Sequence, residues 1–459
     1  MRRDGEWSAK LRAHVADSVT TPMTTGATPE PGSLWTRVTG ARAHEREALL
    51  IAFVYFFCVL AAYYLLRPVR DQFSAAVGST NLWQFWVGTF LVTLAMVPLF
   101  GALVARYPRE KFIPATYLFF IACLIAFIPA FALEDRIGAR VLGTVFYIWL
   151  SVFSLFVVSV FWSFMADLFD SAQARRLFPV IAVGGTLGAI VGPIVASLLP
   201  IRALLIAAIG LLVVSIACAW RLSAWSQRHP NPQRHGELAR GEVIGGDVWA
   251  GLRQVFASPF LRSMIALMLL GDAIGTVAYV LTADVVGAHA STSEARKTVY
   301  AHIDLAVNTL QLVLQVGITR LLMSRFGVVS ALIADGVVKG IALLATIIVG
   351  APMVIPMLVV TRGSTYGIGK PASDSLYARA ERETRYKGKN VIDTAGWRFG
   401  DVVVSLSMKA LTGLGVGVAG FALISTVAAA LSGWFGWRAA HAPELAPEHA
   451  GAIAANARD

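Results

Sequence analysis

Long apolar runs recur along almost the whole of this chain, and they constrain its fold more than any other feature. A run of about 18 residues or more is long enough to cross the hydrocarbon core of a bilayer as a helix. Because lipid offers the backbone no hydrogen-bond partner, a spanning segment must be a helix or part of a closed barrel. The runs are continuous rather than alternating, which favours helices. The sequence therefore predicts an all-α integral membrane protein.

The composition excludes a soluble globular domain. Of the 459 residues, 56% are hydrophobic and only 15% are charged, and the mean hydropathy is +0.65. The net charge of +11 is spread over the segments between the apolar runs, a distribution typical of cytosolic loops in membrane proteins. We therefore predict a lipid bilayer and no nucleic acid as a partner. Cys58, Cys123 and Cys218 all fall inside apolar runs, so neither a disulfide framework nor a metal cluster is predicted.

About twelve predicted spans divide into two sets of six. The first set comprises residues 49–66, 82–104, 112–133, 141–166, 177–200 and 203–220. The second set comprises residues 260–288, 302–323, 328–350, 352–372, 391–412 and 414–436. Arg106 and Arg325 follow the second and the eighth span at matching positions, so the two sets share a plan. This pattern predicts two pseudo-symmetric six-helix halves with a site between them.

The polar segments complete the predicted organisation. It consists of a disordered cytosolic arm (1–48), a first six-helix bundle (49–220), a basic cytosolic linker (221–254), a second bundle (255–438) and a disordered tail (439–459). Lys and Arg concentrate in the arm and in the even-numbered connections, which predicts that both termini are cytosolic. The arm has no apolar core of the kind that a cleavable signal peptide needs. We expect a multi-pass protein of the cell's inner (cytoplasmic) membrane.

The densest group of charges surrounds the tenth and eleventh spans. Its candidate site residues are Arg362, Tyr366, Lys370, Asp374, Asp393 and Arg398. Helical spacing puts Arg362, Tyr366 and Lys370 on one face. A charge inside a bilayer is costly and usually faces a bundle interior or a water-filled cavity. Two fixed positive groups beside an aromatic ring suit a large anion, and Asp393 with Arg398 is predicted to hold the connection between the two spans.

A second group of candidates, Arg67, Arg70 and Asp71, lies at the end of the first span. Two interpretations stay open. The arginines with their neighbouring tyrosines can anchor the span at the lipid headgroups. Alternatively, Arg67 or Arg70 faces a cavity and binds an anion, since guanidinium pairs bidentately with phosphate or carboxylate.

Several acids lie within other spans. Asp167 in the fourth span and Asp284 in the seventh are predicted to be gating or coupling acids. The eighth span carries a polar stripe of Asp304, Asn308, Gln311 and Gln315. Such a stripe is more often interhelical hydrogen bonding than a ligand path. Asp335 and Lys339 can neutralise each other along one helix face and are interpreted as structural.

Small residues in the fifth span indicate close helix packing. Gly184, Gly188 and Gly192 share one helical face and allow another helix to approach closely. No phosphate loop of the Walker type, zinc-ligand spacing or nucleophile elbow occurs in the sequence. We therefore predict neither an enzyme nor a cofactor.

Three stretches resemble the ATP/ADP translocase type of nucleotide transporter. YYLLRPVRD (63–71) is similar to the end of that family's first helix, and FWSFMADLFDSAQARRLFPVIAVGGTLGAIVG (161–192) to its fourth and fifth helices. ASDSLYARAERETRYKGKNVIDTAGWRFGD (372–401) is similar to its tenth and eleventh. GALVARYPREK (101–111) also resembles a loop motif of the major facilitator superfamily, although Ala105 replaces the usual acid. The resemblance implies a major facilitator-like fold and nucleotide exchange.

The family uses charged residues in helices one, four, seven and ten for exchange. The resemblance carries the first onto Arg70, where the family has lysine, the second onto Asp167 and the third onto Asp284. The lysine of the tenth helix falls on Ser373, followed by Asp374. This departure bears on nucleotide exchange itself, and Arg362 or Lys370 would have to supply the positive charge.

The sequence thus predicts a monomeric, alternating-access secondary transporter of a small anionic metabolite. Nucleotide exchange of the ATP/ADP kind is the stronger form of this prediction. Arg70, Arg362 and Lys370 would bind the anion. The alternatives are a proton-coupled transporter of another organic solute, and a non-transporting membrane protein that retains the fold.

Overall fold

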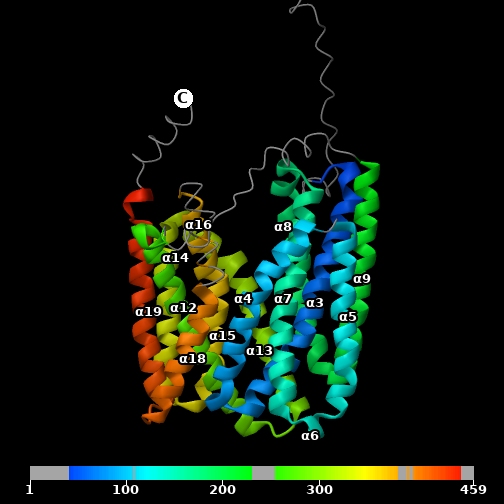
Figure 1. The fold of residues 1–459 in the computed structure, drawn as a ribbon. Coiled ribbons are helices and arrows are strands. Elements are labelled where there is room, and N and C mark those ends of the chain that lie inside the picture. The colour runs from blue at the N-terminus through cyan, green and yellow to red at the C-terminus, as the bar shows by residue number, and fades with distance from the viewer. Residues whose placement is uncertain are drawn as a thin grey trace, which may run out of the picture. The chain divides into compact units, whose positions relative to one another are not determined.

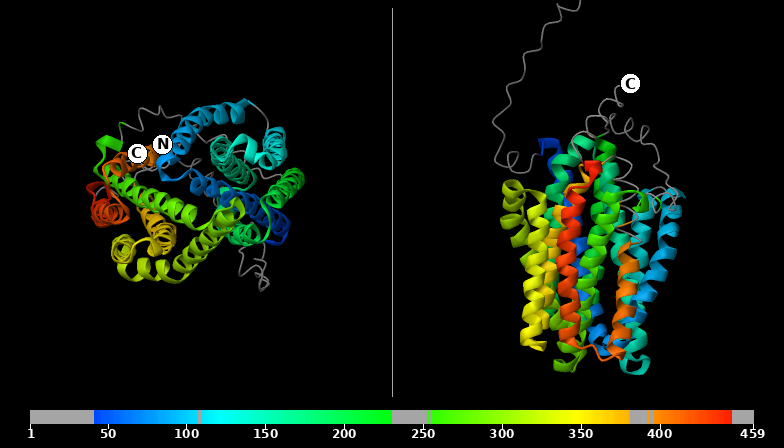
Figure 2. Two further views of the ribbon diagram at one scale, coloured as in Figure 1. Left: turned by 90° about the horizontal axis from the view of Figure 1, so that it is seen from below. Right: turned by 90° about the vertical axis from the view of Figure 1, so that its left-hand side faces the viewer.

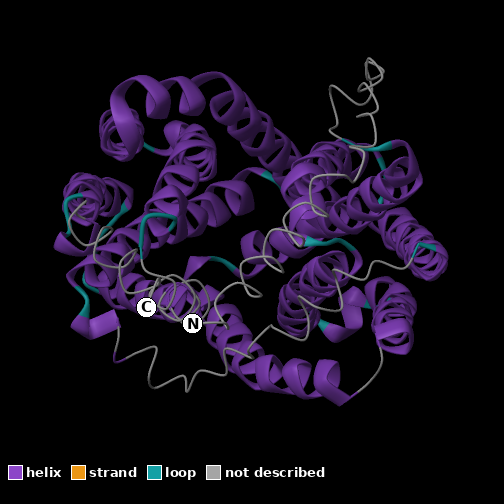
Figure 3. Cartoon of the chain, turned by 90° about the horizontal axis from the view of Figure 1, so that it is seen from above, coloured by secondary structure: helices purple, strands orange, loops and turns teal. Residues whose placement is uncertain are grey.

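The computed structural model describes residues 41–106, 109–229, 255–380 and 396–445, together with residues 253, 389 and 392. Throughout these ranges the regular secondary structure is helical, with short connecting loops (Figure 3). The chain divides into two units at residue 46. The described part of the first unit holds a short 3-10 turn, η1 (Ala43–Glu45), which Arg42 closes by donating its backbone N–H to Glu45 Oε2 at 2.8 Å. The second unit contains the helical bundle.

The helices follow the predicted spans in order. In the first half they are α3 (Arg46–Val77), α4 (Leu82–Arg106), α5 (Arg109–Ala132), α7 (Ala139–Leu168), α8 (Ser171–Leu198) and α9 (Ile201–Arg228), with η2 (Ser79–Asn81) and α6 (Glu134–Ile137) between them. In the second half they are α12 (Pro259–His289), α13 (Ser293–Val313), η3 (Leu314–Thr319), α14 (Arg320–Val349), η4 (Ala351–Met353), α15 (Val354–Ser364), η5 (Thr365–Gly369), α16 (Lys370–Tyr377), α18 (Trp397–Gly413), α19 (Val418–Ala440) and η8 (Pro443–Leu445).

The chain is a multi-pass membrane protein. Within the described residues, eight helices are long and apolar enough to cross a bilayer, and one of these, Ser293–Val349, covers two predicted spans. A break at Gly327, whose φ of +82° suits a residue without a side chain, lies between those two spans. Large apolar side chains such as Leu118, Phe119 and Ile348 are exposed on the bundle, where lipid can cover them. The total of about twelve spans stays a prediction, because the eight helices do not include α4, α18 or the tenth span, which is divided among α15, η5 and α16.

The two halves lie side by side with their helices roughly parallel (Figures 1 and 2). Between the halves, α13 packs against α8, and α18 packs against α4. The end of the bundle at which α3 begins and α19 ends is named here the terminal end. The opposite end, which carries η2 and α6, is the turn end.

Several helices, among them α3, α9 and α19, extend beyond the predicted boundaries. α3 continues through Pro68 to Val77, since a proline in a membrane helix is tolerated where neighbouring groups satisfy the backbone. α9 continues to Arg228, into the segment predicted as a linker. α19 continues to Ala440, and η8 follows it, because Glu444 Oε1 accepts a hydrogen bond from Ser258 Oγ at 2.9 Å. The rest of the predicted linker and tail lies almost entirely outside the described residues.

Candidate functional site

A cavity of about 630 Å³ lies between the halves and is lined from both. α3, α4 and α7 line it from the first half, and α12, α13, α14, α15, η5, α16, α18 and α19 line it from the second. Its basic lining residues are Arg67, Arg70, Lys339, Arg362 and Lys370, and its acidic ones are Asp272, Asp335 and Asp401. The size falls within the usual range for small-molecule sites, about 300–1,000 Å³.

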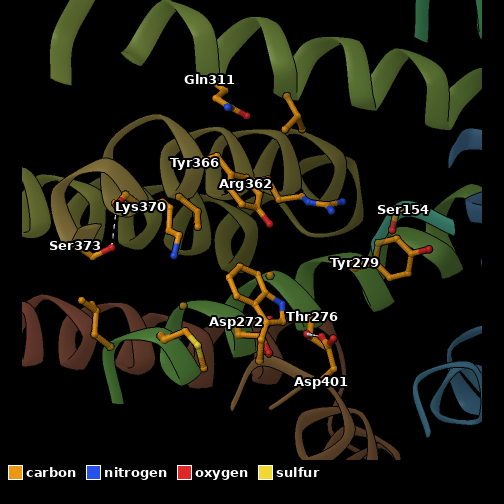
Figure 4. Close-up of a pocket in the computed structure, with 18 of the residues that line it drawn as sticks. Ser154, Asp272, Thr276, Tyr279, Gln311, Arg362, Tyr366, Lys370, Ser373 and Asp401 are labelled. Atoms are coloured by element: carbon orange, nitrogen blue, oxygen red, sulfur yellow. Dashed lines mark hydrogen bonds between the residues drawn. The ribbon is translucent and has the colours of Figure 1, made fainter. Parts of the chain in front are cut away.

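One wall carries Arg362, Tyr366 and Lys370 (Figure 4). Arg362 lies in the last turn of α15, and Tyr366 lies in η5, a π-helical turn that widens the helix before Lys370. Arg362 is half-buried, and its guanidinium forms no hydrogen bond or ion pair with any other described residue. The Lys370 ammonium lies 3.3 Å from Asp374 Oδ1, at the outer edge of this wall. A half-buried guanidinium that is not held in an ion pair within the described chain can bind an anion.

The deep end of the cavity holds a buried ion-pair network centred on Asp71. Arg70 donates from Nε to Asp71 Oδ1 at 2.7 Å, and Arg67 lies 3.7 Å from the other carboxylate oxygen. Arg67 also pairs with Asp304 of the second half at 3.4 Å. Tyr279 donates its hydroxyl to Asp71 at 2.9 Å. Arg67, Asp71 and Asp304 are almost fully buried, so the interior interpretation of the arginines holds over anchoring at headgroups.

A second buried pair lies on α14. Lys339 donates to Asp335 Oδ2 at 2.6 Å, and Ser364 of α15 donates its hydroxyl to Asp335 Oδ1. Both charged residues line the cavity, although the sequence favoured a purely structural role. The two charges therefore neutralise each other, and the hydrogen bond from Ser364 joins α15 to α14.

The opposite wall carries Asp272, Thr276 and Asp401 (Figure 4). Thr276 Oγ1 donates to Asp401 Oδ1 at 3.2 Å, which ties α12 to α18. A methyl group at Gly400 would lie 2.7 Å from Asp272 Oδ2, so the missing side chain lets α18 approach this carboxylate. Trp397 lines the cavity one turn earlier on α18.

The polar contacts described between the halves gather toward the turn end. Asp284 Oδ1 accepts a hydrogen bond from Ser79 N at 2.9 Å, and Glu294 Oε1 accepts one from Ile201 N at 2.9 Å. Lys297 donates to the carbonyl of Leu199 at 2.6 Å. In contrast, the cavity lining extends toward the terminal end, as far as Met264 near the start of α12 and Tyr377 at the end of α16.

The cavity brings together Arg67, Arg70, Arg362, Tyr366 and Lys370 of the predicted site residues. Asp71 lies directly behind the arginines, and Asp374 forms ion pairs with Lys370 and, at 2.9 Å, with Lys389. Asp167, in α7, and Asp284, at the turn end, are not among the residues that line the cavity. Asp393 lies outside the described residues, and Arg398 lies in α18 with no described side chain.

Sequence reasoning missed Trp397 and gave Asp304 too small a part. Charge marks the candidates at the span ends, whereas Trp397 is an uncharged ring next to Arg398 in the resembled motif. Asp304 belongs to a polar stripe in the sequence, but its pairing with Arg67 joins helices far apart in the chain. The end of the first span carries two arginines and one acid. This excess of positive charge indicates that a carboxylate from another helix pairs with one of the arginines.

Among proteins of known function, the chain is distantly similar to ADP,ATP carrier protein 3 of Rickettsia. It is 27% identical to the Rickettsia conorii protein over 146 residues, which are 31% of this chain and 28% of that carrier. It is 27% identical to the Rickettsia prowazekii protein over 161 residues, which are 29% of this chain and 32% of that carrier. The match thus spans less than a third of these carriers' length. No protein-family model matches the chain.

Solved transporter structures match over most of the chain. A bacterial homologue of the iron transporter ferroportin, in an inward-facing state, aligns with a TM-score of 0.62 and 15% identity, covering 89% of this chain and all of that one. A D-xylose–proton symporter aligns with a TM-score of 0.58 and 12% identity, covering 88% of this chain and 99% of that one. The nucleoside transporter NupG aligns with a TM-score of 0.57 and 13% identity, covering 87% of this chain and 98% of that one. The chain thus shares its fold with these solved transporters.

Proposed function

We propose that this protein is a monomeric, alternating-access transporter that exchanges one small organic anion for another, with nucleotides as the leading substrates. The observation that carries the proposal is the convergence of Arg362, Lys370 and the two arginines of α3 on one cavity between the halves. Guanidinium and ammonium groups in a partly desolvated cavity favour phosphate or carboxylate. The distant similarity to ADP,ATP carriers supports a nucleotide as that anion.

The arrangement of contacts supports a state that is open toward the terminal end. The halves are joined near η2 and the start of α13, while the cavity lining continues to Tyr377. With both termini in the cytosol, the proposed site would face the cytosol and be closed on the other side. Arg362 and Lys370 would then meet the substrate first, and Arg70 would lie deeper. Asp167 and Asp284 would act on gating rather than by touching the substrate.

Exchange in proteoliposomes tests the proposal. Purified protein is reconstituted with internal ADP, and the entry of radiolabelled ADP is compared with entry into vesicles that contain buffer alone. We expect uptake that depends on internal ADP. Arg362→Gln should lower it about 10–100-fold, because a hydrogen bond to a charged group contributes about 1.5–3 kcal/mol. Arg202→Gln, an exposed arginine at the start of α9, is the matched control and should transport normally.

The alternatives give different results in the same assay. Uptake that needs no internal anion but follows an imposed pH gradient would replace exchange by proton coupling. Failure to transport any nucleotide or other organic phosphate, by protein that remains folded, would refute the proposed substrate class.

A further inference from the structure

We propose that Tyr366 and Trp397 form an aromatic slot that binds the flat heteroaromatic ring of the substrate, as in a nucleotide. The inference deepens the proposed anion transport and rests on it. Both rings line the cavity, Tyr366 from η5 and Trp397 from α18. Their planes are within 13° of parallel, and their centroids are 6.5 Å apart.

This centroid separation lies at the wide end of the range of about 4.5–7 Å that aromatic pairs show. Other near-parallel pairs within the described chain lie closer. Phe56 and Phe161 are 4.4 Å apart at 15°, and Trp225 and His229 are 4.9 Å apart at 23°. Trp149 and Phe153 are 5.4 Å apart at 24°. The slot pair is thus the most parallel of the four and also the most widely spaced.

The centroid separation is an upper limit on the gap between the two ring planes. Stacked bases in duplex DNA repeat every ~3.4 Å, so a ring held between two others needs roughly 6.8 Å. The separation of 6.5 Å is close to that value, and the proposed slot requires the two rings to lie face to face. Trp397 and Tyr366 lie on different helices, so a small shift of α18 against η5 can adjust the gap.

The charges around the slot suit the rest of a nucleotide. Arg362 and Lys370 flank Tyr366 on its own helix face, one turn to either side, where they can bind phosphate groups. Asp272 and Asp401 lie on the wall across the cavity (Figure 4). Carboxylates accept hydrogen bonds from exocyclic amino groups, so this wall favours a ring that carries one. The slot thus selects an amino-substituted ring attached to an anion.

The test compares ligands that differ only in the ring or only in the charge. Purified full-length protein in detergent is titrated calorimetrically with AMP, ribose 5-phosphate and adenosine. We expect AMP to bind at least about tenfold more tightly than ribose 5-phosphate, as stacking of one base allows. Trp397→Leu should bring the ratio of the affinity for AMP to that for ribose 5-phosphate close to one. Trp397→Phe should keep part of the preference for AMP. Trp434→Leu, an indole 47% exposed on α19, is the matched control and should keep the wild-type ratio.

The outcomes separate the slot from the transport proposal. Equal affinity for AMP and ribose 5-phosphate, unchanged by Trp397→Leu, would overturn the slot and leave anion binding intact. Binding of adenosine without either phosphate would retain the slot and overturn the proposed anion substrate. If Trp397→Leu does not fold, Tyr366→Leu and Tyr366→Phe replace it, with loss of the ratio expected only in the leucine variant. Absence of binding by both AMP and adenosine would refute the slot.

Discussion

Charged side chains buried in this bundle occur in groups that join different helices. Arg67 of α3 contacts Asp304 of α13, and Asp335 of α14 accepts from both Lys339 and Ser364. An isolated charge in such surroundings would be strongly unfavourable, and its nearest compensation is a partner of opposite sign. Each group therefore fixes the relative position of two or more helices.

Replacing Asp304 by asparagine tests the pair that crosses between the halves. Asp304→Asn leaves Arg67 without its partner from the second half, and loss of one member of a buried pair typically costs about 3–5 kcal/mol. We expect a clearly lower melting temperature in detergent. Asp135→Asn, an exposed acid in α6, should melt like the wild type. Equal melting of all three proteins would mean that the pair contributes nothing to stability.

A double-mutant cycle tests the pair on α14. Asp335→Asn and Lys339→Met each leave one buried charge behind, whereas the double variant leaves none. We expect the double variant to be more stable than the sum of the single effects by at least about 1 kcal/mol. Chemical unfolding of the four proteins measures this difference. Strict additivity would show that the two charges do not interact.

Individual elements approach each other most closely where α8 crosses α3. A methyl group at Gly184 would lie 2.5 Å from the carbonyl oxygen of Phe53, and one at Gly188 would lie 2.5 Å from that of Phe57. At Gly192 the neighbour is Tyr64 Cβ at 2.7 Å. The glycine face predicted from the sequence is therefore the surface that packs on α3, the helix that carries Arg67.

Gly188→Ala tests this contact. The added methyl group meets backbone atoms of α3 that cannot rotate away, and overpacking of this kind costs about 1–3 kcal/mol. We expect a lower melting temperature together with weaker binding of anions, because α3 must shift. Gly210→Ala in α9, where no heavy atom lies within 4 Å of the added group, is the control. A destabilisation of the same size in both variants would point to helix propensity rather than to packing.

Helix order was predictable from the sequence, whereas helix continuity was not. Long apolar runs mark each segment, and glycines with positive φ at Gly327 and Gly350 coincide with predicted span ends. Periodicity cannot reveal that α3 runs on past Arg67, where that side chain pairs with Asp304 of another helix. Nor does it reveal the π-helical turns η3 and η5, where Thr319 Oγ1 donates to the carbonyl of Gly367 at 2.6 Å. Tertiary contacts decide both features.

At the scale of the whole molecule, contacts and cavity point to opposite ends. Polar contacts join the halves toward the turn end, and the cavity lining reaches toward the terminal end. The residues of the candidate site come from both halves. The basic residues of the site could be predicted from residue type and spacing in the sequence. That they line one cavity could not be predicted, because it depends on how the halves pack.

Thiol labelling tests which end opens. In a background without Cys58, Cys123 and Cys218, Ser373→Cys places a thiol in the cavity, and Asp135→Cys places one at the turn end. A membrane-impermeant reagent should label Ser373→Cys from the side of the termini and Asp135→Cys from the opposite side. Added ADP should slow the first reaction and leave the second unchanged. Labelling of both thiols from the same side would contradict the proposed opening.

Arg67 takes part in two arrangements, since it lines the cavity and also holds Asp304 across the halves. One guanidinium cannot serve a carboxylate and a substrate phosphate at full strength together. Under the proposed exchange, a bound substrate anion would compete with Asp304 for Arg67 and weaken the contact between the halves. Without substrate, the ion pair would stay formed and the halves would stay in contact. Such an ion pair would suppress the conformational change in protein without substrate, so solute gradients would not dissipate through it. A cell could then keep many copies in its membrane without a leak.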